Sequence, residues 1–362
     1  MTPDQALSEI KDVAESLFRP RAETADREAP SPSGIVASNV RLLADRGYYG
    51  LGIDTRYGGM GSDDFTRREF TEVIAAACGV TAFTQQQFHS GGGFVGGSSN
   101  EGLKADLLPR LAAGETVCGI AFSHLRRRGA PVVTAKPVDG GYVVDGRAPW
   151  VTGWSFIDGI ILGATVEKPD GVDHLFAYVP KSVSTLPTPA LALHVMSASD
   201  TVEVDLNEVF VPSTNVIGMR PAEDLRRSDY CGISGHVFLP LGCARGSVRY
   251  LRELAAARQS DRLIEIADIF EREIDACRRE AIIWNGSCAD MPGYKEHALG
   301  ARTLAIELAV RGAHAAVAAT GGAAQMLDHA PQRLMREAVF YTTLAQTPDV
   351  QAGTLDRLVK NL

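Results

Sequence analysis

The chain has 362 residues, of which 45% are hydrophobic and 22% are charged, so it can bury a large core in two or three domains. Its formal net charge of −8 argues against a general nucleic-acid-binding protein, because such proteins need a basic surface to neutralise phosphates. The chain has no run of 18 apolar residues, and its amphipathic, acidic N-terminus shows no signal-peptide pattern. We therefore expect a cytoplasmic protein that binds neither nucleic acid nor membranes.

The six cysteines are scattered along the chain. They form no CxxC pair, and no histidine stands near them at metal-ligand spacing. They stand at positions 78, 118, 231, 243, 277 and 288. This pattern is typical of reduced thiols in an intracellular protein. We expect neither a disulfide framework nor a metal site.

The first 115 residues have apolar side chains at helical spacing. The spacing predicts helices at 4–18, 34–46, 65–77, 80–94 and 103–113, with Gly114 as the C-terminal cap of the last. A glycine-rich stretch at 47–61 interrupts them and is expected to be a loop with tight turns. The N-terminal part is thus predicted to be an α-helical domain, residues 1–115.

From residue 116 the pattern changes from helical spacing to alternation. Short segments rich in Val, Ile, Thr and Phe, separated by Gly, Pro and Asp, indicate a small barrel or sandwich over 116–218. Helical spacing returns in four long segments at 237–257, 261–284, 294–319 and 330–345. Their short connections favour an antiparallel bundle within residues 219–362.

One stretch of the β region, DGGYVVDGRAPWVTGW at 139–154, combines turn signals with aromatic residues. Its two Asp-Gly pairs bracket a short β-branched run, which predicts a tight hairpin whose return strand carries Trp150 and Trp154. The aromatic faces, the hydroxyl of Thr152 and the bare backbone of Gly153 would together line a planar cofactor. A packed corner of the barrel is the alternative.

Several segments resemble, in order and spacing, those of the acyl-CoA dehydrogenase superfamily. They are GYYGLGIDTRYGGMG (47–61), LPRLAAGE (108–115), DGGYVVDGRAPWVTG (139–153), VEVDLNEVFVP (202–212), LGCARGSV (241–248) and ATGGAAQMLDHAPQRLMREA (319–338). The resemblance implies an α+β multi-domain protein with an N-terminal helical domain, a central β-barrel and a C-terminal four-helix bundle. It also implies a homodimer or homotetramer, because subunits of this superfamily complete one another's FAD sites.

FAD is the cofactor that the resemblance implies. The positions that match the flavin-lining ones are Phe122, Ser123, Trp150, Thr152, Gly321 and Gly322. Two contacts that usually cross the dimer are missing: the chain reads ARQSDRLIE where the family has RxxFG, and Ala318 stands where a glutamine precedes the glycine pair. Weakened FAD binding is therefore expected.

The resemblance also locates the catalytic base, a glutamate that takes the α-proton of an acyl thioester. One usual position holds Ala345, and the alternative position, on the first bundle helix, holds Gly232. Three histidines are candidates for a substitute base, His89, His124 and His236, because imidazole titrates near neutral pH. A structural role for each is the competing interpretation. Arg126 to Arg128 form either a solvated face or a phosphate contact.

Three functions remain open. The first is an FAD-dependent oxidoreductase, similar to acyl-CoA dehydrogenases, that oxidises a carrier-bound acyl thioester or a related activated substrate and passes electrons to an unidentified acceptor. The second is a flavin-dependent monooxygenase that works through a C4a-hydroperoxyflavin, with His89, Ser123 and His124 around it and a flavin reductase as partner. The third is a flavin-free, non-catalytic partner subunit.

Overall fold

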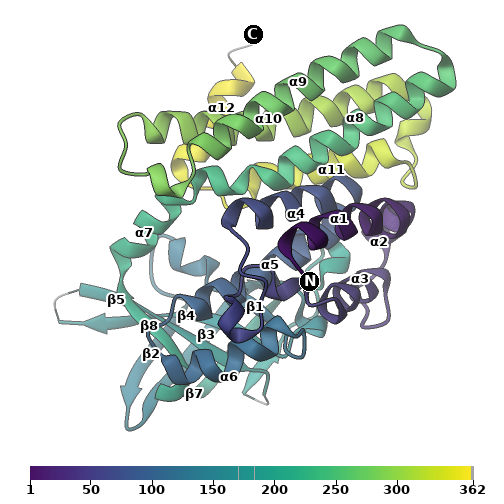
Figure 1. Ribbon diagram of the computed structural model, residues 1–362. Coiled ribbons are helices and arrows are strands. Elements are labelled where there is room, and N and C mark those ends of the chain that lie inside the picture. Colours follow the sequence, from purple (N-terminus) through teal and green to yellow (C-terminus); the bar gives the residue numbers. More distant parts are fainter. Residues whose placement is uncertain (170, 183, 360–362) are drawn as a thin grey trace.

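The computed structural model describes residues 1–169, 171–182 and 184–359 (Figure 1). Along these residues the chain forms helices, then a sheet, then helices again, which confirms the predicted fold class. The division predicted after residue 115 falls between the last N-terminal helix and the first strand, whereas residue 218 lies within the last strand. The domain division itself stays a prediction.

The N-terminal part is helical, as its apolar spacing predicts. Its helices are α1 (Pro3–Val13), α2 (Ala22–Arg27), α3 (Ile35–Asp45), α4 (Asp64–Ala77), α5 (Gly79–Gly96) and α6 (Glu101–Ala112). The predicted helix at 4–18 continues past α1 as a π-helical turn, Ala14–Phe18. The helix α2 was not predicted, because six residues are too few to show a helical period.

The middle of the chain forms one eight-stranded mixed sheet. Its strands are β1 (Cys118–Ala121), β2 (Val133–Val138), β3 (Gly141–Val151), β4 (Gly159–Lys168), β5 (Gly171–Pro180), β6 (Thr185–Pro187), β7 (Val202–Pro212) and β8 (Val216–Pro221). The strand order is β6-β7-β3-β2-β4-β5-β8, and β1 pairs with β4 in parallel. Val144, Ala148 and Val151 alternate inward along β3 and are fully buried, so this strand carries much of the core.

The predicted hairpin is present, but only one of its two Asp-Gly pairs forms a turn. Asp139-Gly140 connects β2 to β3, with Val138 opposite Gly141. Asp145-Gly146 lies inside β3, where the register with β7 shifts. Gly146 has φ of 130°, and Asp145 accepts a hydrogen bond from the backbone N–H of Glu208 at 2.8 Å. This pair is therefore a β-bulge, and Trp154 lies beyond the end of the strand.

The C-terminal part contains the four predicted long helices and two more. Its helices are α7 (Ala222–Cys231), α8 (Phe238–Arg258), α9 (Asp261–Ile283), α10 (Tyr294–Thr320), α11 (Ala330–Thr343) and α12 (Pro348–Val359). The helix α10 contacts α8, α9, α11 and α12, and Figure 1 shows these helices side by side at one end of the molecule. Within the described residues, none of the helices combines the length and hydrophobicity that crossing a membrane requires.

The N-terminal helix α4 packs closely on α8 of the bundle. A Cβ atom added at Gly242 would lie 2.5 Å from the Cβ of Ala75 and 2.6 Å from the carbonyl oxygen of Glu72, so only glycine fits there. One turn later, a Cβ at Gly246 would lie 2.9 Å from the carbonyl oxygen of Ala76. The two helices therefore meet backbone to backbone over a turn.

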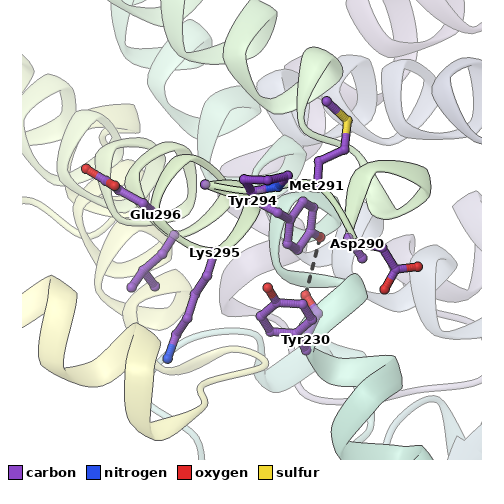
Figure 2. A pocket seen from close by; sticks show the side chains of 10 residues that line it. Tyr230, Asp290, Met291, Tyr294, Lys295 and Glu296 are labelled. Carbon is purple, nitrogen blue, oxygen red and sulfur yellow. Dashed lines mark hydrogen bonds between the residues drawn. The ribbon is translucent and has the colours of Figure 1, made fainter.

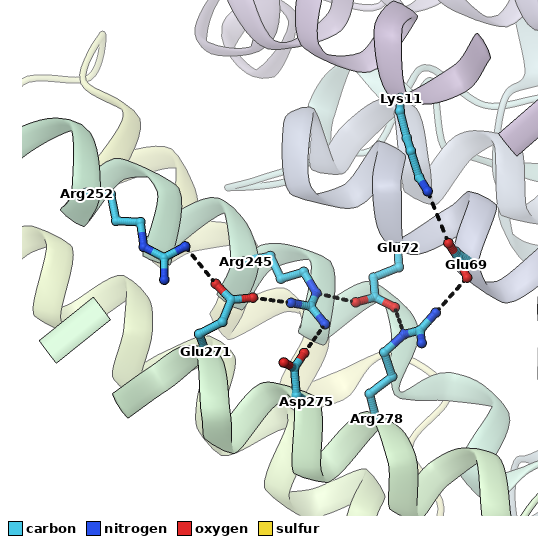
Figure 3. Close-up of polar contacts among 8 residues, drawn as sticks. All are labelled: Lys11, Glu69, Glu72, Arg245, Arg252, Glu271, Asp275 and Arg278. Carbon is cyan, nitrogen blue, oxygen red and sulfur yellow. Dashed lines mark hydrogen bonds and ion pairs between the residues drawn. The ribbon is translucent and has the colours of Figure 1, made fainter. Parts of the chain in front are cut away.

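An ion-pair network surrounds this contact (Figure 3). The side chain of Glu72 on α4 is 5% exposed; its two oxygens accept from Arg245 of α8 at 2.6 Å and from Arg278 of α9 at 2.9 Å. Arg278 also pairs with Glu69 at 2.9 Å. Glu72, which lies in the N-terminal part, thus binds two helices of the bundle, α8 and α9, through its one carboxylate.

We predict that Glu72→Gln lowers the unfolding free energy by about 3 kcal/mol, because it leaves two partly buried guanidinium groups without their shared carboxylate. Thermal and urea unfolding followed by circular dichroism would measure the change. Glu265→Gln is the matched control on α9, since its pair with Arg262 is exposed on both sides and is expected to contribute less than about 1 kcal/mol. Equal effects of the two substitutions would contradict the prediction.

Candidate functional site

The end of β3 presents an exposed tryptophan on a strained backbone. A second register shift against β7 lies between Ala148 and Val151, and Trp150 within it has φ of 62°. A non-glycine residue in this region costs about 1 kcal/mol or more. The shift removes Trp150 from the regular ladder, and this residue is 55% exposed although the neighbouring Val151 is fully buried. The strained backbone of β3 thus holds a wide aromatic face at the surface.

The residues after Trp150 anchor this tryptophan to the loop before β7. The hydroxyl of Thr152 is buried and hydrogen-bonds to that of Thr201 at 3.0 Å, which bonds in turn to Ser199 at 2.9 Å. The backbone N–H of Gly153 donates to the carbonyl of Ser199 at 2.8 Å. The hydroxyl of Thr152 is therefore engaged within the protein, and its anchoring holds the end of β3 in place.

The turn after β1 contains three further predicted residues, and they differ in exposure. Phe122 is buried, with its ring against those of Phe94 and Phe176, while Ser123 is exposed. His124 is buried, and its Nε2 lies 2.8 Å from the carbonyl oxygen of Gly163. Burial lowers the pKa of His124 to about 4. Of these three side chains, only that of Ser123 faces the surface.

Gly321 and Gly322 lie at the end of α10 and are exposed. A Cβ atom at either position would meet nothing within 4 Å, so this chain's own packing does not require glycine there. Beside them, the guanidinium of Arg258 donates to the carbonyls of Ala319 and Thr320, and only two residues connect α8 to α9. The guanidinium of Arg258 is thus already hydrogen-bonded to the end of α10.

The two positions expected for a catalytic base lie on segments that the structure brings together. Gly232 precedes the 3₁₀ turn Ile233–His236, and Ala345, with φ of 48°, lies two residues past the end of α11. The guanidinium of Arg302 on α10 donates to the carbonyl of His236 and, at 2.7 Å, to that of Leu344. Neither segment carries a carboxylate, since the sequence reads CGISGHV on one side and LAQT on the other.

Of the candidate bases, His236 lies in this region and His89 lies elsewhere. Burial, together with the positive charge of Arg302, lowers the pKa of His236 to about 3. His89 is on α5, where its Nε2 is 2.9 Å from the carbonyl oxygen of Tyr48 and its ring packs against Tyr49 and Phe70. Burial lowers the pKa of His89 to about 4. Imidazoles with such low pKa values are neutral but weak bases at pH 7.

A cavity of about 630 Å³ opens at the same end of the bundle (Figure 2). Tyr230 of α7 and Tyr294 of α10 form its aromatic wall, with ring centroids 5.2 Å apart. The hydroxyl of Tyr294 donates to the carbonyl of Cys231 at 2.7 Å. This bond connects the cavity wall to the segment that contains Gly232, although Gly232 itself does not line the cavity.

Neither Arg302 nor this cavity was predicted from the sequence. A signal for Arg302 was available, because it interrupts the apolar stripe formed by Ala298, Ala301 and Ala305 on α10, where a charged residue conflicts with the pattern. No comparable signal marks the cavity, because the two tyrosines are 64 residues apart. In the part of the chain that the structure describes, no group of three His, Cys, Asp or Glu side chains is arranged to hold a metal ion.

Comparisons with known proteins find similarity to acyl-CoA dehydrogenases. Residues 3–115 match the family described as acyl-CoA dehydrogenase, N-terminal domain. The probable acyl-CoA dehydrogenase YngJ of Bacillus subtilis (strain 168) is 25% identical over 379 residues, which cover 96% of this chain and 95% of that protein.

Two solved structures share the fold over almost the whole chain. Butyryl-CoA dehydrogenase from Megasphaera elsdenii has a TM-score of 0.83 and 19% identity, over 99% of this chain and 98% of that one. Dibenzothiophene monooxygenase from Paenibacillus sp. A11-2 has a TM-score of 0.80 and 18% identity, over 99% and 98%.

We predict that the unfolding free energy falls as the pH falls from about 6.5 to about 4. In the unfolded chain, His89 and His124 bind protons near pH 6.5, whereas in the folded protein both stay neutral until the pH falls to about 4. His89→Gln should therefore make the fall with pH shallower, as measured by urea unfolding at several pH values. His314→Gln, at an exposed position on α10, is the control. Parallel curves for His89→Gln and the wild type would contradict the prediction.

Proposed function

The chain belongs to the acyl-CoA dehydrogenase superfamily, and on this basis we propose that it is a flavin-dependent oxidoreductase acting on an acyl thioester or a related activated substrate. The observation that carries the proposal is the exposed ring of Trp150, which a strained and anchored backbone holds at the surface. A strained residue of this kind is typical of a binding site. A planar ligand would cover the apolar ring.

The residues present fit the ring system of a flavin better than they fit the remainder of FAD. Trp150, Ser123 and the exposed glycine pair would hold the cofactor, and a bound flavin would supply hydride transfer. The two-residue α8–α9 turn and the engaged guanidinium of Arg258 leave few donors for the distal part of a dinucleotide. We therefore propose FAD as the cofactor, with weakened binding.

The site lacks the carboxylate that α-proton abstraction normally uses. Alanine and glycine occupy the expected positions, and His236, the one candidate histidine on these segments, has a pKa of about 3. A general base is most effective when its pKa lies near the working pH. Desaturation through a carboxylate base is thus not the reaction that these residues support.

This observation favours a second candidate, a flavin-dependent monooxygenase, whose chemistry needs no α-proton base. Dibenzothiophene monooxygenase shares the fold, which is consistent with this alternative. Oxygen consumption by the purified protein with externally reduced flavin, in the presence and absence of an acyl-CoA, would separate the two candidates. The electron acceptor of the first, or the flavin reductase of the second, would be its protein partner.

Exposed apolar side chains on the C-terminal helices are consistent with the expected homodimer or homotetramer. They include Ile264, Ile269 and Ile283 on α9, Val339 on α11, and Leu355, Leu358 and Val359 on α12.

We predict that Trp150→Ala lowers the flavin retained on purification at least several-fold, because it removes the aromatic face. The ratio of absorbance near 450 nm to that at 280 nm, with identification of the released flavin, measures this loss. The control is Phe210→Ala, which removes a ring of similar exposure on β7, opposite Val143 and thus far from the end of β3. Unchanged flavin content in Trp150→Ala would refute the placement of the cofactor.

We predict that the wild-type protein does not exchange the α-protons of an acyl-CoA with D₂O, and that Ala345→Glu gains measurable exchange. Mass spectrometry of the recovered thioester detects the deuterium. Ala345→Gln is the control, since it adds a side chain of the same size without a basic carboxylate. Exchange by the wild type would show that another residue serves as the base.

A further inference from the structure

The surface beside the turn after β1 carries four arginines whose side chains have no partner. They are Arg127, Arg128, Arg220 and Arg226, and all of them are exposed. Within the residues that the structure describes, none of these four guanidinium groups forms an ion pair or a hydrogen bond. Many other arginines of the chain hold a carboxylate or a backbone carbonyl, as Arg258 does. We refer to the four residues as the arginine cluster.

The fold brings three separate segments together to form this cluster. In the turn after β1, the guanidinium of Arg126 donates to both carboxylate oxygens of Asp229 on α7, at 2.8 and 2.7 Å. This bidentate pair holds the next two residues of the chain, Arg127 and Arg128, beside α7. Arg226 lies three residues before Asp229, and side chains at this spacing share one face of a helix. Arg226 therefore lies on the face of α7 that the turn approaches.

The fourth member of the cluster, Arg220, lies on β8, the strand directly before α7. It is opposite His174 of β5 in the sheet register, and α7 packs on both strands (Figure 1). Burial lowers the pKa of His174; the nearby Asp173 opposes this shift, and the positive charges of Arg226 and Arg126 add to it. The arginines of β8, of α7 and of the turn after β1 therefore surround one place, next to His174.

Carboxylates on β5 and α7 offset the cluster only in part. Asp173 and Asp229 already have basic partners. Glu223 and Asp224, in the first turn of α7, form no ion pair within the described residues. Two carboxylates against four guanidinium groups leave an excess of positive charge here, although the net charge of the whole chain is −8.

Unpaired guanidinium groups that converge on one place repel one another, and an anion that contacts several of them removes this repulsion. The planar guanidinium group donates two parallel hydrogen bonds to phosphate oxygens, which makes arginine the residue best suited to bind phosphate. A nucleic-acid backbone fits less well, because it requires a basic surface much longer than this one. The chemistry of the cluster thus favours a small ligand that carries phosphate groups.

We propose that the arginine cluster is a surface binding site for the phosphate groups of a small phosphate ester. Arg127 and Arg128 contact these groups from the turn after β1, Arg226 from α7 and Arg220 from β8. Charge and hydrogen bonds, rather than enclosure in a cavity, hold the ligand. The phosphates come either from a nucleotide-containing carrier of the substrate or from a free nucleotide. The site requires no flavin, so it goes beyond the proposed function and can be tested separately from it.

The test is isothermal titration of inorganic pyrophosphate into the purified protein at low ionic strength. The wild type should bind pyrophosphate, and added salt should weaken this binding. The double variant Arg127→Ala/Arg226→Ala should bind it roughly tenfold more weakly or worse, because it loses two sets of charge-assisted hydrogen bonds. The matched control is Arg272→Ala/Arg279→Ala on α9, which removes two arginines that are also exposed and unpaired within the described residues. The control should bind pyrophosphate as the wild type does.

Absence of pyrophosphate binding in the wild type would overturn the proposal without recourse to any variant. An equal loss of affinity in the control would overturn it as well, since overall charge rather than the cluster would then bind the anion. The four substituted side chains hold no partners, so both variants should fold, and urea unfolding checks this.

Titrations with CoA and ADP identify the source of the phosphates. Tighter binding of CoA assigns the site to a carrier of the substrate, and equal binding assigns it to a free nucleotide. Either result supports the proposal only if Arg127→Ala/Arg226→Ala weakens that binding, and unchanged binding in this variant contradicts it. A protein that retains no flavin and still binds pyrophosphate through the cluster would refute the proposed function and leave this site standing.

Discussion

The close contact between α4 and α8 is the constraint on which the arrangement of the C-terminal part depends. Gly242 and Gly246 allow the two backbones to meet, and the carboxylate of Glu72 binds α8 and α9 from the N-terminal side. Removing a charge from water is unfavourable, so a carboxylate that is 5% exposed persists only because both of its oxygens are paired. This contact fixes where α8 starts. It thereby places the turn Ile233–His236, which Arg302 then joins to the end of α11.

Two kinds of buried arginine follow from this arrangement. Arg333 lies among carboxylates and contributes to the interior much as Glu72 does, as one member of a balanced group. Arg302 is compensated only by carbonyl dipoles, which carry partial charges and leave the site positive. The same difference separates a structural ion pair from a charge that can act on a ligand. Buried charges at the contact between α4 and α8 are therefore paired with opposite charges. At the end of the bundle, the charge of Arg302 is met by backbone carbonyls instead.

Much of the fold could be predicted from the sequence, because long helices and short alternating strands have distinct periods. The four long bundle helices and the β2–β3 turn at Asp139-Gly140 follow from local patterns. Asp145-Gly146 has the same local pattern and forms a bulge instead, since pairing with β7, over 50 residues away, decides its conformation. The site is harder to predict for the same reason. Trp150 could be selected from its neighbours, but the pairing of His236 with Arg302 depends on how distant helices pack.

The positive charges near His236 have a direct physical consequence. A positive field lowers the pKa of a nearby imidazole, because it disfavours the protonated form, and it lowers the free energy of an anion in the same place. A site of this kind is a poor one for a histidine that must take up a proton, and a good one for a group that arrives already negative. Arg302 itself is held by the carbonyl oxygens of His236 and Leu344, so within the described residues backbone dipoles rather than a carboxylate compensate its charge.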